Sequence, residues 1–200
     1  MQDRDLVHHG LAIKRLSTPA AIAGLIGLPE ARVAALLAQA EATGRALASR
    51  GAYTLSPLAR VALDGRYEFY FAELRADAAF GAQYERFEVV NKSLKQVITD
   101  WQTIVLGGSS VTNDHSNKDY DAAIIDRLGE IHEQVDPILA GLAGKLPRLA
   151  IYARKLLAAL EAAEDGDIEW VSDIRRESYH TVWFELHEDI LRIMGREREE

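Results

Sequence analysis

The sequence predicts a mainly α-helical fold in two parts, a small head that contains one β-hairpin and a larger, acidic helical domain. Apolar residues recur at three- and four-residue spacing along most of the chain, which is typical of amphipathic helices. The first 66 residues carry eight Lys and Arg against five Asp and Glu, a net charge of +3, whereas the remainder carries fifteen against twenty-six, a net charge of −11. We therefore expect two domains, residues 1–66 and residues 67–200.

The composition excludes several classes of protein. Cysteine is absent, which excludes disulfide bonds and thiolate metal sites. No apolar run approaches the ~18 residues of a membrane-spanning helix, and the acidic residues near the start do not fit a secretory signal. We expect a cytoplasmic protein that needs no cofactor and no bound metal. The acidic total also argues against nucleic-acid binding by the whole chain and leaves that function open for the head alone.

The head begins with three predicted helices. The first covers residues 5–15, and Ser17 is the expected N-cap of a short second helix that ends at Ile26. Gly27-Leu28-Pro29 forms a turn, because proline suits the start of a helix and glycine suits the end of one. A third helix then continues as far as Gly44. This order is that of a helix-turn-helix.

A hairpin and a fourth helix complete the head. Residues 45–55 are expected to form two short strands that reverse at Ser49-Arg50-Gly51, and Ser56 then caps a helix with Pro57 at its first position. The whole order is that of a winged helix-turn-helix. The segment Leu55-Ser56-Pro57-Leu58-Ala59-Arg60 resembles the end of the wing in MarR-like regulators, which often reads Leu-Ser/Thr-Pro-x-Gly/Ala-Arg. The resemblance covers about a third of the chain.

In such a module the second helix of the turn presents side chains to base edges, and basic wing residues contact phosphates. The candidate DNA-binding residues are Arg32, Gln39, Arg45 and Arg50. The same helix also carries Glu30 and Glu41 and is otherwise rich in alanine. This composition leaves a second role open, in which the winged helix is a protein–protein docking module.

About five helices are expected after residue 66, with breaks at Gly107-Gly108, residues 144–147 and residues 165–167. Residues 67–80 are rich in aromatic side chains and are expected to form a core helix that joins the two parts. In the next helix a polar line of Asn91, Lys95 and Gln102 runs beside the buried stripe and is either a solvated flank or the wall of a pocket. Residues 107–119 are expected to be irregular, with Asp119 as the N-cap of the following helix.

The last helix combines large aromatic side chains with histidines. Its face at three-, four- and seven-residue spacing consists of His180, Trp183, Phe184, His187 and Leu191. Histidines on such a face are either satisfied core residues or ligand-binding groups. The spacing of His180 and His187 is not a strong metal signature, so a metal centre that adds distant carboxylates is the weakest alternative.

This second part resembles an uncharacterised helical domain found with winged helices and with phosphoenolpyruvate-utilising phosphotransferase modules. The likeness is carried by Trp101-Gln102, Asn113-Asp114-His115, Tyr120-Asp121 and the run 179–189. It implies that these polar clusters converge on one pocket. The candidate ligand-binding residues are Asn91, Lys95, Trp101, His115, Tyr120, Tyr179, His180, Trp183 and His187. The candidate acids and bases for catalysis are Asp114, His115, Tyr120, Asp121, His180, Glu185 and His187.

Two functions fit these patterns. The first is a one-component transcriptional regulator, a homodimer whose winged helix binds DNA while the helical domain senses a small molecule, with an aromatic compound as one candidate ligand. The alternative is an enzyme or accessory substrate-binding subunit, for example of a phosphotransferase that acts on an aromatic hydroxyl compound, with the winged helix as its docking module. The sequence has no nucleotide-binding glycine loop, so a phosphoryl donor site would belong to a partner.

Overall fold

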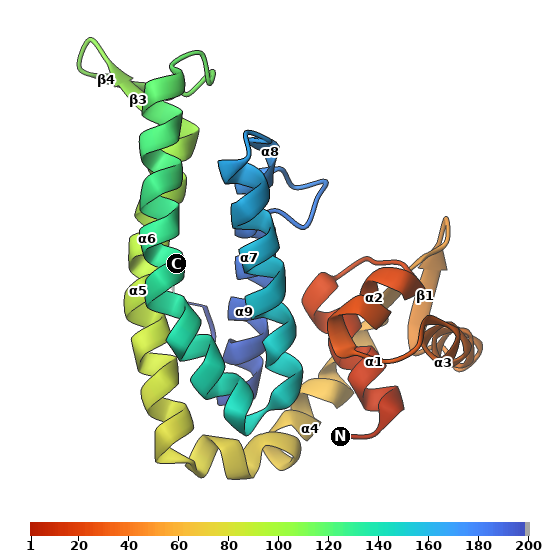
Figure 1. The fold of residues 1–200 in the computed structure, drawn as a ribbon. Helices are drawn as coiled ribbons and strands as arrows, with labels where there is room; N and C mark the ends of the chain where they lie inside the picture. The colour runs from red at the N-terminus through yellow and green to blue at the C-terminus, as the bar shows by residue number, and fades with distance from the viewer. Residues whose placement is uncertain (199–200) are drawn as a thin grey trace. The chain divides into compact units, whose positions relative to one another are not determined.

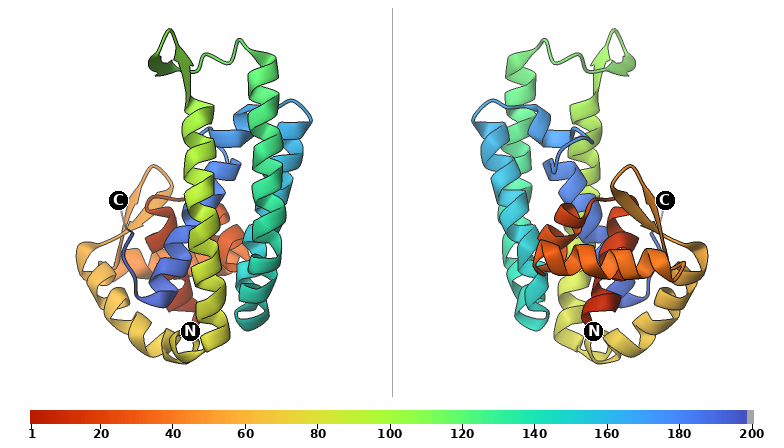
Figure 2. Two further views of the ribbon diagram at one scale, coloured as in Figure 1. Left: turned by 90° about the vertical axis from the view of Figure 1, so that its left-hand side faces the viewer. Right: turned by 90° about the vertical axis from the view of Figure 1, so that its right-hand side faces the viewer.

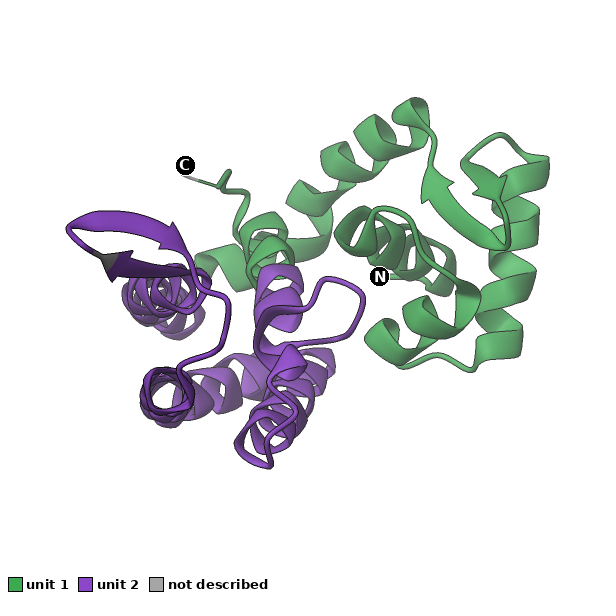
Figure 3. Cartoon of the chain, turned by 90° about the horizontal axis from the view of Figure 1, so that it is seen from above, with its two compact units in different colours: residues 1–77, 187–200 green, residues 78–186 purple. Residues whose placement is uncertain are grey.

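The computed structural model describes residues 1–198, and over this range the chain is mainly helical, as predicted, with two small antiparallel hairpins (Figure 1). It divides into two compact units, residues 1–77 with the chain from residue 187 onward, and residues 78–186 (Figure 3). The boundary expected at residue 66 therefore falls inside helix α4 (Pro57–Ala76). Helix α9 (Tyr179–Met194) begins in the second unit and ends in the first.

Three helices begin the first unit, α1 (Asp3–Lys14), α2 (Pro19–Ile26) and α3 (Glu30–Ala42). The predicted N-cap of α2 was wrong by one residue, because the side chain of Thr18 accepts the hydrogen bond from the Ala21 N–H. Ser17 is instead extended and pairs with Tyr53, and their N–H groups each donate to the other's carbonyl at 3.0 and 2.8 Å. Its backbone thus belongs to a β-bridge rather than to the start of a helix.

The chain turns by 117° between α2 and α3. Gly27 takes a φ of +75° at the end of α2, a conformation that favours glycine, and Pro29 is the last non-helical residue before α3. No single helix within residues 1–198 is both long and apolar enough to span a membrane, although this bent pair reaches that length and composition when its two helices are taken together.

A tight hairpin follows α3. Strands β1 (Ala46–Ser49) and β2 (Ala52–Leu55) pair with Ser49 opposite Ala52, so the loop has only two residues. Those residues, Arg50 and Gly51, have φ angles of 51° and 81°, the left-handed pair that a type I′ turn requires. Ser56 caps α4, as predicted, through a hydrogen bond from the Ala59 N–H.

Helix α1 is held against α4 by polar contacts and against α2 by close packing. The Asp5 carboxylate accepts hydrogen bonds from Arg66 Nη1 at 2.6 Å and from the Tyr70 hydroxyl at 2.7 Å. Burial opposes ionisation of Asp5, but the bond from Tyr70 and the charges of Arg4 and Arg66 lower its pKa overall. At Gly10 the backbone of α1 lies so near α2 that an added Cβ would be 2.9 Å from Ile22 Cγ2.

The second unit contains a long helical hairpin. Helices α5 (Ala78–Gln102) and α6 (Lys118–Lys145) lie side by side along their length (Figure 2). They are connected by β3 (Thr103–Leu106) and β4 (Ser109–Thr112). The expectation of an irregular stretch from residue 107 was therefore wrong in part, because Gly107 and Gly108 both have positive φ and close a two-residue turn between Leu106 and Ser109. Asn117, and not Asp119, caps α6 through the Tyr120 N–H.

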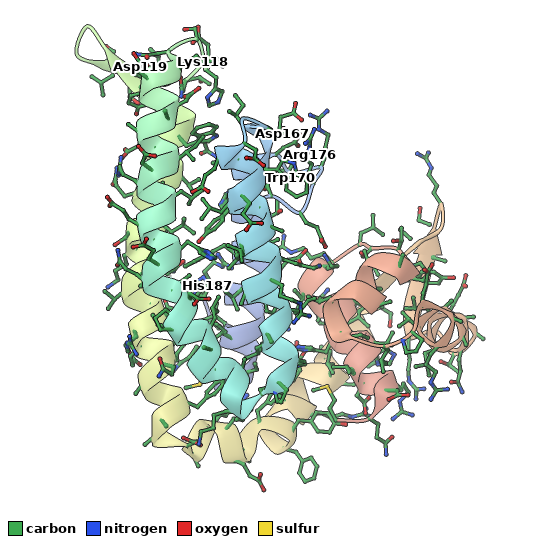
Figure 4. The ribbon with its side chains drawn as sticks, in the orientation of Figure 1. Lys118, Asp119, Asp167, Trp170, Arg176 and His187 are labelled. Atoms are coloured by element: carbon green, nitrogen blue, oxygen red, sulfur yellow. The ribbon has the colours of Figure 1, made fainter. Side chains whose placement is uncertain are left out.

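Shorter elements complete the second unit. A 3₁₀ turn (Pro147–Leu149) leads into α7 (Ala150–Glu164), and α8 (Glu169–Ser172) precedes α9. Arg176 holds the segment between α7 and α9 through ion pairs with Asp167, at 2.8 Å, and with Glu169, and its Cζ lies 5.8 Å from the centre of the Trp170 ring (Figure 4). These charges are partly exposed, so they order the loop and add little stability.

The close approach of α1 and α2 predicts opposite effects for two glycine substitutions. Gly10→Val forces a side chain into Ile22 and should lower the free energy of unfolding by about 1–3 kcal/mol. Gly24→Ala in α2 is the matched control, because nothing lies within 4 Å of its added Cβ, and it should raise that free energy by about 0.5–1 kcal/mol. Urea denaturation followed by circular dichroism measures both. Equal stability of the two variants would contradict the packing described.

Candidate functional site

All four predicted DNA-binding residues are exposed in the first unit. Arg32 and Gln39 lie on α3, Arg45 lies directly before β1, and Arg50 lies in the hairpin turn. Arg32 Nε donates to Asp3 Oδ2 at 3.0 Å, and both side chains are about half exposed. An exposed ion pair of this kind is worth about 0–1 kcal/mol, so a phosphate oxygen can replace the carboxylate at little cost.

In the second unit, four predicted site residues meet Asn113 where the β3–β4 hairpin joins α5 and α6. Asn113 Nδ2 donates to Asp121 Oδ1 at 3.0 Å and to the Trp101 carbonyl at 3.1 Å. The same Asp121 oxygen lies 3.1 Å from His115 Nδ1, and the His115 ring packs 4.5 Å from the Trp101 ring. Tyr120 donates its hydroxyl to the Asp100 carbonyl at 2.8 Å. We call Trp101, Asn113, His115, Tyr120 and Asp121 the tip group.

Within the tip group, His115 and Asp121 have the arrangement of a base whose ring is oriented by a carboxylate. His115 is half-buried and holds a φ of 58°, which is uncommon for a residue other than glycine, while Asp121 is buried. A buried carboxylate that binds one ring nitrogen fixes the orientation of the imidazole and leaves the other nitrogen for proton transfer. Asn113 was not among the predicted site residues, although it organises the group. The sequence did contain a signal for Asn113, because it begins the Asn113-Asp114-His115 motif.

A second set of predicted residues lies inside the helical bundle. Trp183 Nε1 donates to Asn91 Oδ1 at 2.9 Å, and the Trp183 ring stacks on Phe87 with centroids 5.0 Å apart. The Tyr179 hydroxyl lies 3.3 Å from His132 Nδ1, and burial raises the pKa of that phenol. We call these five residues the interior group. Because their polar atoms bond to one another, the geometry favours a packing role.

The structure gathers the predicted residues in two groups rather than in one pocket. Asp121 of the tip group and His132 of the interior group are eleven residues apart on α6, which is about 16 Å at 1.5 Å per residue. Lys95 is exposed on α5, Asp114 is exposed and caps the Ser116 N–H, and His180 and Glu185 are half-buried on α9. His187 is buried in the part of α9 that belongs to the first unit (Figure 4).

No group of three or more His, Asp or Glu side chains within residues 1–198 is placed to hold a metal ion. The alternative of a metal centre around His180 and His187 therefore gains no third ligand from the residues that the structure describes.

The most buried polar network lies in the first unit and was not predicted. His9 Nδ1 lies 2.8 Å from the Tyr67 hydroxyl, and His9 Nε2 lies 3.0 Å from Asp189 Oδ1. The side chains of His9 and Asp189 are fully buried. Burial raises the pKa of Tyr67, so its hydroxyl keeps its proton and can donate to Nδ1 while Nε2–H donates to Asp189. The network joins α1, α4 and α9.

The sequence carries no signal for this network, because its members are 58 and 180 residues apart. A histidine on an apolar helix face indicates burial but does not indicate which residue it bonds to.

The chain matches no protein-family model, no curated protein and no solved structure.

The burial of His132 predicts a pH dependence of stability. Burial lowers the pKa of His132 below its ordinary 6.5, although Asp136, Glu164 and Glu161 oppose the shift. The unfolded chain then binds more protons than the folded chain as the pH falls below about 6.5, so the free energy of unfolding should decrease there.

His132→Gln removes this contribution. The fall in thermal midpoint between pH 7.5 and pH 5.5 should be smaller in the variant than in the unsubstituted protein. If both proteins lose the same amount over this range, His132 does not contribute as described.

Proposed function

We propose that the first unit is a winged helix that binds duplex DNA, and that the protein is a transcriptional regulator. The observation that carries the proposal is the 117° turn between α2 and α3 across three residues. Helix-turn-helix motifs have two helices at about 90–120° joined by a turn of this length. The β1–β2 hairpin that follows, with the Ser17–Tyr53 bridge at its side, supplies the wing.

The distribution of charge supports DNA binding by the first unit alone. Arg45 and Arg50 lie at the base and at the turn of the hairpin, where a wing contacts phosphates or the minor groove. Arg32 and Gln39 are exposed on α3, the helix that would enter the major groove. Residues 78–186 carry eleven Lys and Arg against eighteen Asp and Glu, so the second unit repels a polyanion.

Arginine substitutions in the wing test the DNA contact. Fluorescence anisotropy with a duplex from the promoter region of its own gene, and with a random duplex, gives the association constant over a range of salt concentrations. Each of Arg45→Ala and Arg50→Ala should reduce the slope of log K against log salt by about 0.9, the value for one phosphate contact. Arg86→Ala on α5, an exposed arginine of the acidic unit, is the matched control and should change nothing. Absence of salt-sensitive binding by the unsubstituted protein would refute the proposal.

We also propose that the regulator is a homodimer that pairs through α4. Three large apolar side chains on this helix are exposed, Leu58 by 80%, Val61 by 70% and Phe69 by 83%. All three fall on one face, and Val61 and Phe69 are placed symmetrically, four residues to either side of Gly65. In an isologous contact between antiparallel α4 helices, Phe69 would pack against the partner's Val61, with the small Gly65 at the crossing point.

Sedimentation velocity tests the dimer. The unsubstituted protein should sediment as a dimer at micromolar concentration, and Phe69→Ser should shift it toward the monomer because an exposed aromatic anchor is lost. Val89→Ser is the matched control, because Val89 is 66% exposed on α5 of the other unit. A monomeric unsubstituted protein, or an equal shift in both variants, would exclude pairing through α4.

A further inference from the structure

An arginine-lined pocket in the first unit is not used by the proposed DNA contact. It has a volume of 430 Å³ and lies against α4, the end of α9 and the residues that follow α9. Four of its wall residues are Arg75, Arg192, Arg196 and Arg198. We propose that this pocket binds a small organic anion through a phosphate or carboxylate group. Its size fits this class, since pockets for small molecules are about 300–1,000 Å³.

Arg192 forms the fixed wall of the pocket. Its Nη1 lies 3.0 Å from Asp64 Oδ1, its Nη2 lies 2.6 Å from Glu188 Oε1, and its Cζ lies 5.9 Å from the centre of the Tyr67 ring. Asp64 and Glu188 thus neutralise Arg192, and the second oxygen of Glu188, Oε2, also lies 4.0 Å from Arg198 Nη2. The guanidinium groups of Arg75 and Arg196 are not paired with these two carboxylates, so their charge is available to a ligand.

Arg75 presents a guanidinium group held in place by the backbone. Its Nε donates to the Ile193 carbonyl at 2.7 Å, and its Nη2 donates to the Arg192 carbonyl at 3.2 Å. Gly195, with a φ of +65°, makes room for this group, because an added Cβ would be 2.9 Å from Arg75 Cζ. A pre-oriented guanidinium loses little conformational entropy when it binds an anion.

Arg196 adds an exposed positive charge to the wall of the pocket. Its backbone N–H donates to the Leu191 carbonyl at 2.9 Å. Its side chain is exposed and forms no ion pair with the residues that the structure describes, 1–198. Glu197 is the acid of the wall that remains beside it. Guanidinium groups bind carboxylates and phosphates through two parallel hydrogen bonds. The arginines of this pocket are therefore suited to an anionic ligand.

Isothermal titration calorimetry with pyrophosphate and with citrate, at constant ionic strength, tests the site. At least one probe should bind the unsubstituted protein, and the relative affinities show whether phosphate or carboxylate is preferred. Arg196→Ala should weaken binding about tenfold, because one charge-assisted contact is lost. Arg75→Lys, which keeps the charge and loses the planar fork, should also weaken binding. Arg86→Ala is the control and should bind as the unsubstituted protein does.

The proposal is overturned if neither probe binds, or if Arg196→Ala and Arg86→Ala bind equally well. A duplex DNA competition separates this site from the DNA contact. If duplex displaces the probe and Arg196→Ala weakens duplex binding to the same degree, these arginines bind the DNA backbone and the small-anion site is refuted. If duplex binding is lost only in the wing variants, both sites stand independently. If the probe binds and no duplex does, the pocket stands and the proposed DNA binding fails.

Discussion

The first unit depends on one buried histidine. His9 lies in the middle of α1 and uses both ring nitrogens, one toward Tyr67 of α4 and the other toward Asp189 of α9. The next residue, Gly10, lets α2 approach α1 closely. The position of α2, and with it the turn into α3, therefore rests on a helix that is held by a polar network in the core. Loss of one partner would leave the remaining buried groups unsatisfied, which costs about 1–3 kcal/mol for each.

Local signals predicted much of the fold. Ser56 followed by Pro57, and Gly27 before Pro29, fixed helix ends because capping depends on a few neighbouring residues. The hairpin of residues 103–112 was missed although its two central glycines are a strong turn signal. Its strands have only four residues each, and the long helices beside them dominate the periodicity. Ser17 was misassigned because a bridge to Tyr53 decides its conformation.

The site residues divide in the same way. Exposure of Arg32, Gln39, Arg45 and Arg50 was predictable, since the face of a helix and the turn of a hairpin follow from local pattern. The depth of a residue along a helical bundle does not follow from local pattern, so the sequence could not separate the candidate residues of the tip group from those of the interior group. Contacts such as Trp183 with Asn91, 92 residues apart, depend on how helices register against one another.

Helix α9 gives the protein an unusual order of assembly. Residues 1–77 leave the ribosome before the helical unit, yet the acceptor for His9 Nε2 is Asp189, 180 residues further along the chain. A nascent chain that stops at residue 77 contains the residues of α1 to α4 and of the β1–β2 hairpin but lacks the Asp189 carboxylate that completes the core of this unit. The head thus becomes fully native only when synthesis of the helical unit is finished, so that truncated chains carry a loosened version of it.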